Sequence, residues 1–263
     1  MKQNGVVKTV IVGSPEATIF TGRTGFTGEE KNNFEILKIA KTYPTQFIAF
    51  PTLNPRDPGK LCKLENYVRM GGKGLKLYSG HGSFHDLPLD HETMMPVYRF
   101  CEDNRIPILF HVNIAYYGNE FERVLGRFPR LKVICPHLCL ATTRTDRFEY
   151  FMDSYSGLYT DISMGAIDFL KQALFRFSQA PDRYRELILK YQNRIFFGTD
   201  IVITDARYKT ADWISKVTRT YRDLLERDTY RFLPIDEELK GFHLGHDVLM
   251  KVYESNFERF LLN

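Results

Sequence analysis

Apolar residues along the chain follow two alternating spacings. Short apolar runs are bounded by polar or turn-forming residues, and between them the apolar residues recur every three or four positions. A short bounded run is typical of a buried strand, and the wider spacing is typical of an amphipathic helix. The short runs predict strands at residues 6–12, 46–50, 74–78, 106–111, 131–137, 158–161 and 195–200. The wider spacing predicts helices at residues 29–41, 61–70, 93–103, 120–127, 145–155, 166–177, 182–192, 206–226 and 246–261.

Strands and helices alternate, with a strand about every 25–40 residues, which is the spacing of repeated βα units. Right-handed crossovers wind such units into a closed barrel or an open doubly wound sheet. An open nucleotide-binding sheet has a glycine-rich phosphate turn after its first strand, whereas residues 12–16 read Val-Gly-Ser-Pro-Glu. We therefore predict an α/β protein with a TIM-type (β/α) barrel, seven of whose eight strands are visible. No linker interrupts the alternation, so we predict one domain over residues 1–263.

The alternation of side chains along the strands predicts a shared polar face. Successive strand residues point to opposite faces, so alternate positions line the interior of a barrel. On this parity Lys76, His111 and His137 point inward near the C-terminal ends of their strands, and Asp200 does the same. Barrel enzymes carry their chemistry at that end of the strands. Four strands thus predict one inward-facing set of polar groups.

His111, His137 and Asp200 have the side chains of a divalent-metal site. Zn²⁺ binds neutral imidazoles and carboxylate oxygens, and water bound to it loses a proton near neutral pH. We predict all three as metal ligands, and Asp200 and His137 also as catalytic groups that move a proton or polarise the substrate. The alternatives are that Asp200 caps the next segment and that His111 is a hydrogen-bonded core histidine. Cys135 and Cys139 flank His137 and suggest a Cys/His zinc site, although the parity favours packing for Cys135.

Other polar residues near the same strand ends are candidates for substrate binding, because loops at this end of a barrel carry specificity. The predicted substrate-binding residues are Lys76, Tyr78, His81 and Asn113. For Lys76 the alternatives are a carboxylated bridging lysine and, the one we favour, an ion pair inside the barrel. For His81, which lies on a loop together with His85, the alternative is an exposed histidine without a role.

Composition and charge exclude several classes of protein. The chain has 263 residues, of which 43% are hydrophobic and 26% are charged, as in an ordinary globular domain. The net charge is +4 and no Lys/Arg cluster forms a stripe, so we expect no nucleic-acid or membrane partner. The four cysteines are scattered, which is typical of reduced thiols. Without a transmembrane-length apolar run or a signal-peptide pattern, the predicted location is cytoplasmic.

Four segments taken together resemble the amidohydrolase superfamily. They are GLKL (residues 74–77), ILFH (108–111), RFPRLKVICPH (127–137) and FFGTD (196–200). The chain is most similar to the amidohydrolase-related branch, which holds hydrolases and metal-dependent decarboxylases. The resemblance implies a (β/α)₈ barrel with a metal centre at its C-terminal mouth. It also implies that His111 is the fifth-strand ligand, that His137 is the sixth-strand histidine, and that Asp200 is the eighth-strand ligand and proton shuttle.

One part of the family pattern is absent from this sequence. The family begins with a strand ending in His-x-His, which supplies two metal ligands, whereas the first histidine here is His81. Residues 1–7 look like the end of the family's first helix running into its second strand. We therefore expect an N-terminally incomplete barrel domain that lacks the first βα unit and holds metal weakly or not at all. Unpaired strand edges would favour pairing between copies of the chain as a homo-oligomer.

From these observations we expect a metal-dependent hydrolase of the amidohydrolase-related family. It would act on a small polar substrate, its only expected partner besides a second copy, through a metal-activated water. The expected cofactor is a divalent metal, with zinc first among the candidates. Two alternatives remain open at this point. One is a metal-dependent decarboxylase, a lyase, on the same scaffold, and the other is a non-catalytic, metal-free barrel remnant.

Overall fold

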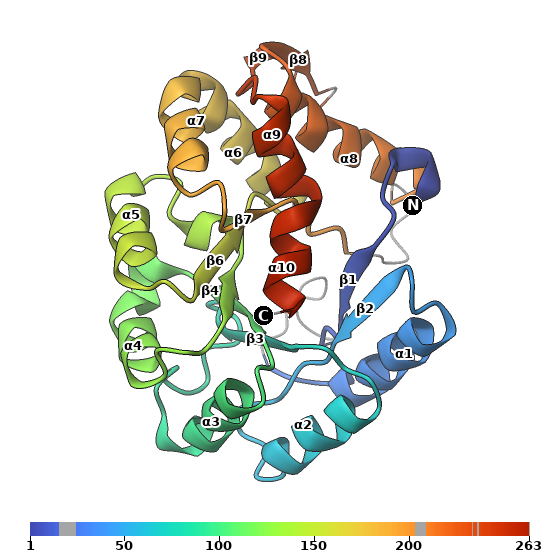
Figure 1. Cartoon of the computed structure of the whole chain (residues 1–263), viewed down its shortest axis with the longest axis vertical. Coiled ribbons are helices and arrows are strands. Elements are labelled where there is room, and N and C mark those ends of the chain that lie inside the picture. The colour runs from blue at the N-terminus through green and yellow to red at the C-terminus, as the bar shows by residue number, and fades with distance from the viewer. Residues whose placement is uncertain (16–24, 203–208, 233, 236, 263) are drawn as a thin grey trace. The chain divides into compact units, whose positions relative to one another are not determined.

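The computed structural model describes residues 1–15, 25–202, 209–232, 234–235 and 237–262 (Figure 1). The contacts within the chain divide it into two compact units. Val6–Tyr159 form the first, which we call the N-terminal unit. Met1–Gly5 and Thr160–Asn263 form the second, which we call the C-terminal unit.

In the described part of the N-terminal unit, five parallel strands follow one another in the order of the sequence. They are β1 (Thr9–Val12), β2 (Phe47–Phe50), β3 (Leu75–Gly80), β4 (Ile108–Val112) and β5 (Val133–Cys135). β1 pairs with β2, and β3, β4 and β5 pair consecutively. A parallel bridge between Thr52 and Lys76 joins the two sets, and the Thr52 hydroxyl donates to the Lys76 carbonyl oxygen at 2.9 Å. Strands wound in sequence order are the arrangement of a (β/α) barrel.

Helices connect these strands and lie on their outer side (Figure 1). They are α1 (Glu29–Thr42), α2 (Lys60–Arg69), α3 (Met95–Asp103), α4 (Ile114–Arg127) and α5 (Thr145–Ser154). Phe110 of β4 is fully buried against them, with its ring centroid 5.7 Å from that of Phe121 and 6.2 Å from that of Tyr98. Because neighbouring strand residues point to opposite faces, His111 faces away from these helices, as the parity predicted.

In the C-terminal unit, the end of β6 (Leu158–Asp161) pairs in parallel with β7 (Ile195–Phe196), and Asp161 lies opposite Phe196. The antiparallel pair of β8 (Thr229–Arg231) and β9 (Glu238–Lys240) was not predicted from the sequence. The further elements are α6 (Ile167–Gln179), α7 (Pro181–Lys190), α8 (Ala211–Glu226), α9 (His246–Met250), a π-helical turn (Lys251–Ser255) and α10 (Asn256–Leu262).

The closing helical segment lies beside β7 (Figure 1). The Phe197 amide donates to the Val252 carbonyl oxygen in the π-helical turn at 2.8 Å. The Asn256 side chain donates to the Ile195 carbonyl oxygen at 2.8 Å. The ring of Phe196 packs on α10, 5.3 Å from the centroid of Phe260. The segment therefore provides hydrogen-bond partners for backbone groups at the strand edge, which would otherwise have to find them elsewhere.

Several predicted boundaries were wrong, each for a local reason. The helix expected from residue 120 begins at Ile114, because the Asn113 side chain accepts a hydrogen bond from the Ala115 amide at 3.0 Å and caps it. The strand expected at 195–200 ends at Phe196. The helix expected at 206–226 begins at Ala211, and residues 206–208 lie outside the described residues.

Candidate functional site

Three histidines from the C-terminal ends of neighbouring strands lie together in the N-terminal unit. The ring centroid of His111, on β4, is 5.0 Å from that of His137, which follows β5. It is 4.9 Å from that of His81, which follows β3. We call His81, His111 and His137 the histidine cluster. The sequence predicted His111 and His137 at strand ends and His81 on a loop, and the parallel pairing of β3, β4 and β5 brings their rings into contact.

His111 has an unusual nitrogen at the centre of this cluster. The residue as a whole is half-buried, but its Nε2 is inaccessible to solvent and has no hydrogen-bond partner among the described residues. Burial holds the pKa of His111 well below its usual range, and His137, Lys76 and His81 lower it further. The ring is therefore neutral near pH 7. A buried polar atom without a partner calls for an explanation, and a ligand is one of the known ones.

The pKa of His111 predicts how the stability of the metal-free protein depends on pH. The folded pKa lies below the usual value of 6.5, so the unfolded chain binds more protons below that pH. The contribution of His111 to the free energy of unfolding is fully present above pH 6.5. It is lost as the pH falls toward the folded pKa, by at most about 1.4 kcal/mol per pH unit. Urea denaturation in EDTA at decreasing pH measures this loss. The free energy of unfolding should fall less steeply with pH in His111→Leu than in wild type. Equal slopes would show that His111 does not cause the loss of stability.

His137 begins a left-handed turn after Pro136, the residue that follows β5. The φ angles of His137, Leu138, Cys139 and Leu140 are 63°, 50°, 56° and 56°. For residues with a side chain this conformation costs about 1–2 kcal/mol each. The Cys139 amide donates to the Pro136 carbonyl oxygen at 3.0 Å, which closes the turn. The predicted strand over 131–137 thus ends earlier, and backbone strain of this kind is concentrated at functional sites.

His81 is held in one tautomer by the loop after β3. Its Nδ1 accepts a hydrogen bond from the Ser83 amide at 3.1 Å. A backbone amide can only donate, so the neutral ring carries its proton on Nε2. The ring also packs on Phe84, with centroids 5.5 Å apart. His81 therefore has a defined hydrogen-bond donor, Nε2–H.

The loop that carries His81 is fastened to α4 by contacts that the sequence did not predict. His85 Nε2 lies 2.9 Å from Glu120 Oε2, and the His85 ring stacks on Tyr117 with centroids 3.9 Å apart. The same Glu120 oxygen accepts a hydrogen bond from the Leu89 amide at 2.8 Å. Glu120 is thus a positioning residue for this loop, and no sequence signal separated it from other helix-surface glutamates.

The other predicted substrate-binding residues have structural contacts of their own. Lys76 and Tyr78 are buried on β3, and the Lys76 Nζ lies 4.6 Å from the centroid of the Tyr78 ring. The Tyr78 ring also packs on Phe84 at 5.2 Å. Asn113 caps α4 with its side-chain oxygen. The positive charge of Lys76 helps to lower the pKa of His111. The side-chain oxygen of Asn113 is engaged in capping α4. Substrate binding by these residues stays a prediction.

Asp200 belongs to the C-terminal unit and is exposed. It follows β7 with a left-handed φ of 48°. Its carboxylate faces Gly165 of the loop after β6, and Lys209 is near enough for the two charges to interact. Asp161, at the end of β6, belongs to the same unit and lies against Gly198. This unit therefore presents two carboxylates at the ends of adjacent strands.

The histidine cluster has the donor atoms of a divalent-metal site. Zn²⁺ and related ions bind neutral imidazoles, and the buried, partnerless Nε2 of His111 fits such a ligand. Over residues 1–15, 25–202, 209–232, 234–235 and 237–262, no group of three or more His, Cys, Asp or Glu side chains is placed to hold a metal ion. Metal binding by His111, His137 and Asp200 therefore stays a prediction.

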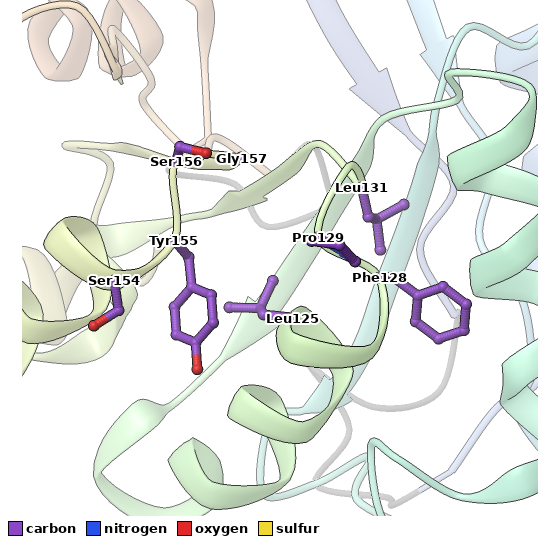
Figure 2. Close-up of a pocket in the computed structure, with 8 residues that line it drawn as sticks. All are labelled: Leu125, Phe128, Pro129, Leu131, Ser154, Tyr155, Ser156 and Gly157. Atoms are coloured by element: carbon purple, nitrogen blue, oxygen red, sulfur yellow. The ribbon is translucent and has the colours of Figure 1, made fainter.

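A small pocket of the N-terminal unit lies at the other end of the strands (Figure 2). It holds about 90 Å³ between the end of α4 and the turns that precede β5 and β6. Its lining residues are Leu125, Phe128, Pro129, Leu131, Ser154, Tyr155, Ser156 and Gly157. These residues precede the strands, and in (β/α) barrels this end serves stability rather than catalysis. The pocket is therefore not part of the candidate site.

Comparison with known proteins bears on the fold and on the family. A family model described as Amidohydrolase matches residues 22–256. An uncharacterised TIM-barrel protein from Bordetella bronchiseptica has a TM-score of 0.68 and 18% identity, over 100% of this chain and 80% of its own. A probable 2-pyrone-4,6-dicarboxylic acid hydrolase from Acinetobacter baumannii, with citric acid bound, has a TM-score of 0.68 and 12% identity, over 100% and 86%.

A third solved structure contains a metal. It is 5-carboxyvanillate decarboxylase from Novosphingobium aromaticivorans, complexed with manganese and 4-hydroxy-3-methoxy-5-nitrobenzoic acid. Its TM-score is 0.58 and its identity 14%, over 99% of this chain and 77% of its own. No curated protein sequence matches this chain. At these identities the likeness shows the fold alone, and the predicted TIM-type barrel class is confirmed.

Proposed function

The chain belongs to the amidohydrolase family, and on that premise we propose that it is a metal-dependent hydrolase acting on a small polar molecule. The observation that carries the proposal is the neutral His111, whose buried Nε2 lacks a partner among the described residues and whose ring lies against two further imidazoles. A core histidine that served only packing would have its nitrogens hydrogen-bonded, because an unsatisfied buried nitrogen costs about 1–3 kcal/mol.

Members of this family use a divalent metal, and the decarboxylase described above binds manganese. We assign His111, His137 and Asp200 as the residues that would hold it. When bound, such an ion acts as a Lewis acid and lowers the pKa of coordinated water. Both zinc and manganese suit imidazole and carboxylate donors, with zinc remaining our first candidate. The low pKa of His111 means that its ring needs to lose no proton before it binds.

The remaining residues of the cluster would orient the substrate. His81 lies against His111, where it would contact the substrate, and Glu120 holds its loop in place through His85. The buried cation of Lys76 attracts an anionic group. Small carboxylate-bearing molecules fit this set.

In the part of the chain that the structure describes, no helix is long and apolar enough to cross a membrane.

The second candidate is metal-dependent decarboxylation on the same scaffold. The groups that act on His111 are His137, Lys76 and His81, all of them basic, which favours a substrate with a carboxylate. Among solved structures of this fold, 5-carboxyvanillate and 2,6-dihydroxybenzoate decarboxylases occur beside the probable pyrone hydrolase. The two candidates differ in the bond that breaks, so product analysis separates them.

Metal binding and product analysis test the proposal together. Metal-stripped protein is titrated with Mn²⁺ or Zn²⁺, and stoichiometric binding that Asp200→Asn weakens is expected. Asp212→Asn, an exposed carboxylate of α8 that pairs with Lys216 at 2.8 Å, is the matched control. Loaded protein is then offered 5-carboxyvanillate and 2,6-dihydroxybenzoate, with CO₂ as readout, and 2-pyrone-4,6-dicarboxylate, with ring opening as readout. Absence of metal binding, with Asp200→Asn indistinguishable from wild type, would leave the metal-free remnant.

A further inference from the structure

The loop after β6 is closed by a carboxylate that also lies against the neighbouring loop. Asp161 Oδ1 accepts hydrogen bonds from the Ser163 amide at 3.0 Å and from the Ser163 hydroxyl at 2.6 Å. Its other oxygen lies over Gly198, where an added Cβ would be 3.1 Å from Oδ2 and 3.2 Å from Cγ. Gly198 comes two residues before Asp200. The absence of a side chain at Gly198 thus lets Asp161 approach the backbone of the β7 loop.

The carboxylate of Asp200, in the loop after β7, likewise lies against a glycine of the loop after β6. Gly165 of the β6 loop has a φ of +57°, a conformation that favours glycine. A Cβ at Gly165 would overlap Asp200 Oδ2 and would lie 3.4 Å from Asp200 Cγ. Each of the two carboxylates therefore lies against a glycine of the other loop. We call these two contacts, Asp161 on Gly198 and Asp200 on Gly165, the carboxylate–glycine lock.

The lock is anchored to α8 by a buried phenol. The Tyr221 hydroxyl oxygen accepts a hydrogen bond from the Met164 amide at 2.7 Å, and the Tyr221 side chain is fully buried. Met164 immediately precedes Gly165, so this bond fixes the residue on which the Asp200 carboxylate rests. Burial raises the pKa of Tyr221 well above its usual value, and the charges of Asp200 and Asp161 act in the same direction, which agrees with their proximity.

We propose that Asp161 and Gly165 are positioning residues that set the direction of the Asp200 carboxylate, an inference that rests on the role of Asp200 in the proposed function. The close approach of Asp200 Oδ2 to Gly165 restricts the rotamers that this exposed carboxylate can adopt. The backbone at Gly165 bounds one side of its rotation, and Asp161 fixes the turn that holds Gly165 there. Loss of a group that orients a ligand in this way typically weakens metal binding by about 10–100-fold.

Gly165→Ala is the direct test of this lock. The atom that the new Cβ meets is the end of the Asp200 side chain, so the carboxylate moves while the loops keep their packing. We expect the dissociation constant for Mn²⁺ to rise by about tenfold. The matched control is Gly5→Ala, since Gly5 has a φ of +71° and no atom within 4 Å of an added Cβ. Gly5→Ala carries the same backbone strain and should leave Mn²⁺ affinity unchanged.

A conservative pair separates geometry from charge at Asp161. Asparagine keeps an oxygen that accepts from Ser163, whereas alanine keeps none. Asp161→Ala should therefore weaken Mn²⁺ binding by about tenfold, and Asp161→Asn should restore affinity to within about twofold of wild type. Equal affinities of Asp161→Ala and wild type would overturn the positioning role.

A double-mutant cycle on the stability of the metal-free protein tests whether Gly165 and Asp200 are in contact. Gly165→Ala is made in wild type and in Asp200→Ala, and the urea midpoints of the four metal-free proteins are compared. If the lock exists, Gly165→Ala lowers the midpoint more in wild type, because Asp200→Ala removes the overlapping atoms. Equal shifts in both backgrounds would overturn it. If wild type binds no Mn²⁺, the proposed function fails, and the cycle still decides whether the two loops are locked.

Discussion

Replacing His111 by leucine is expected to stabilise the metal-free protein and to abolish its binding of divalent metal. The Nε2 atom is buried and has no hydrogen-bond partner within the described residues. An unsatisfied buried group costs about 1–3 kcal/mol, and leucine fills a similar volume without a polar atom. We therefore expect the free energy of unfolding to rise by about 1 kcal/mol. Loss of a ligand should weaken Mn²⁺ binding by about 100-fold or more.

Opposite signs for stability and binding would identify His111 as a functional rather than a packing residue. Urea denaturation gives the first quantity and Mn²⁺ titration the second. Phe110→Leu is the matched control, because Phe110 is the preceding residue of β4 and packs on the opposite face against Phe121. That variant should lose about 1–3 kcal/mol of stability and keep its metal affinity. A less stable His111→Leu protein with normal Mn²⁺ affinity would contradict our interpretation.

The largest loss of stability is expected from Gly80→Ala at the end of β3. A Cβ there would overlap the carbonyl oxygen of His111 and would lie 2.5 Å from the Cα of Val112. Both atoms belong to the backbone of β4, which cannot rotate away as a side chain can. We therefore expect a loss of about 3 kcal/mol or more, together with displacement of the strand that carries His111.

The matched control for this prediction is Gly126→Ala on the exposed side of α4. An added Cβ at Gly126 meets no atom within 4 Å, and its φ is not in the left-handed region. Alanine should therefore stabilise the helix by about 0.5–1 kcal/mol. Urea midpoints of both variants measure the contrast. A Gly80→Ala protein as stable as wild type would mean that β3 and β4 are less closely paired than the structure has them.

The fold could be predicted from the sequence to the extent that it depends on local patterns. The strand at 158–161 has the predicted bounds, and the opposite facing of Phe110 and His111 follows the predicted parity. Both depend on the two-residue period of a strand, which is visible in the chain itself. The Asn113 cap was also within reach, because Asn before an apolar helical run is a known N-terminal signal. It was assigned to substrate binding instead.

The candidate site was predicted as a set of residue types and not as an arrangement. The contact between His85 and Glu120 joins residues 35 positions apart, and no periodicity records such a pair. The left-handed turn that begins at His137 is formed by residues with side chains, which sequence rules assign to other conformations. Glu120 and Asp161 gained positioning roles only through these distant contacts.

By itself the sequence determined the order of the parallel strands and of the helices between them, the barrel class, the family resemblance and the position of His111 on its strand. These depend on hydrophobic period and residue type, which are properties of short segments. Only the tertiary structure decided that three imidazoles meet, that one of them has a buried nitrogen without a partner within the described residues, and that two glycines each lie against a carboxylate. The reason is physical, since burial, pKa and close approach are set by neighbours that lie far away along the chain.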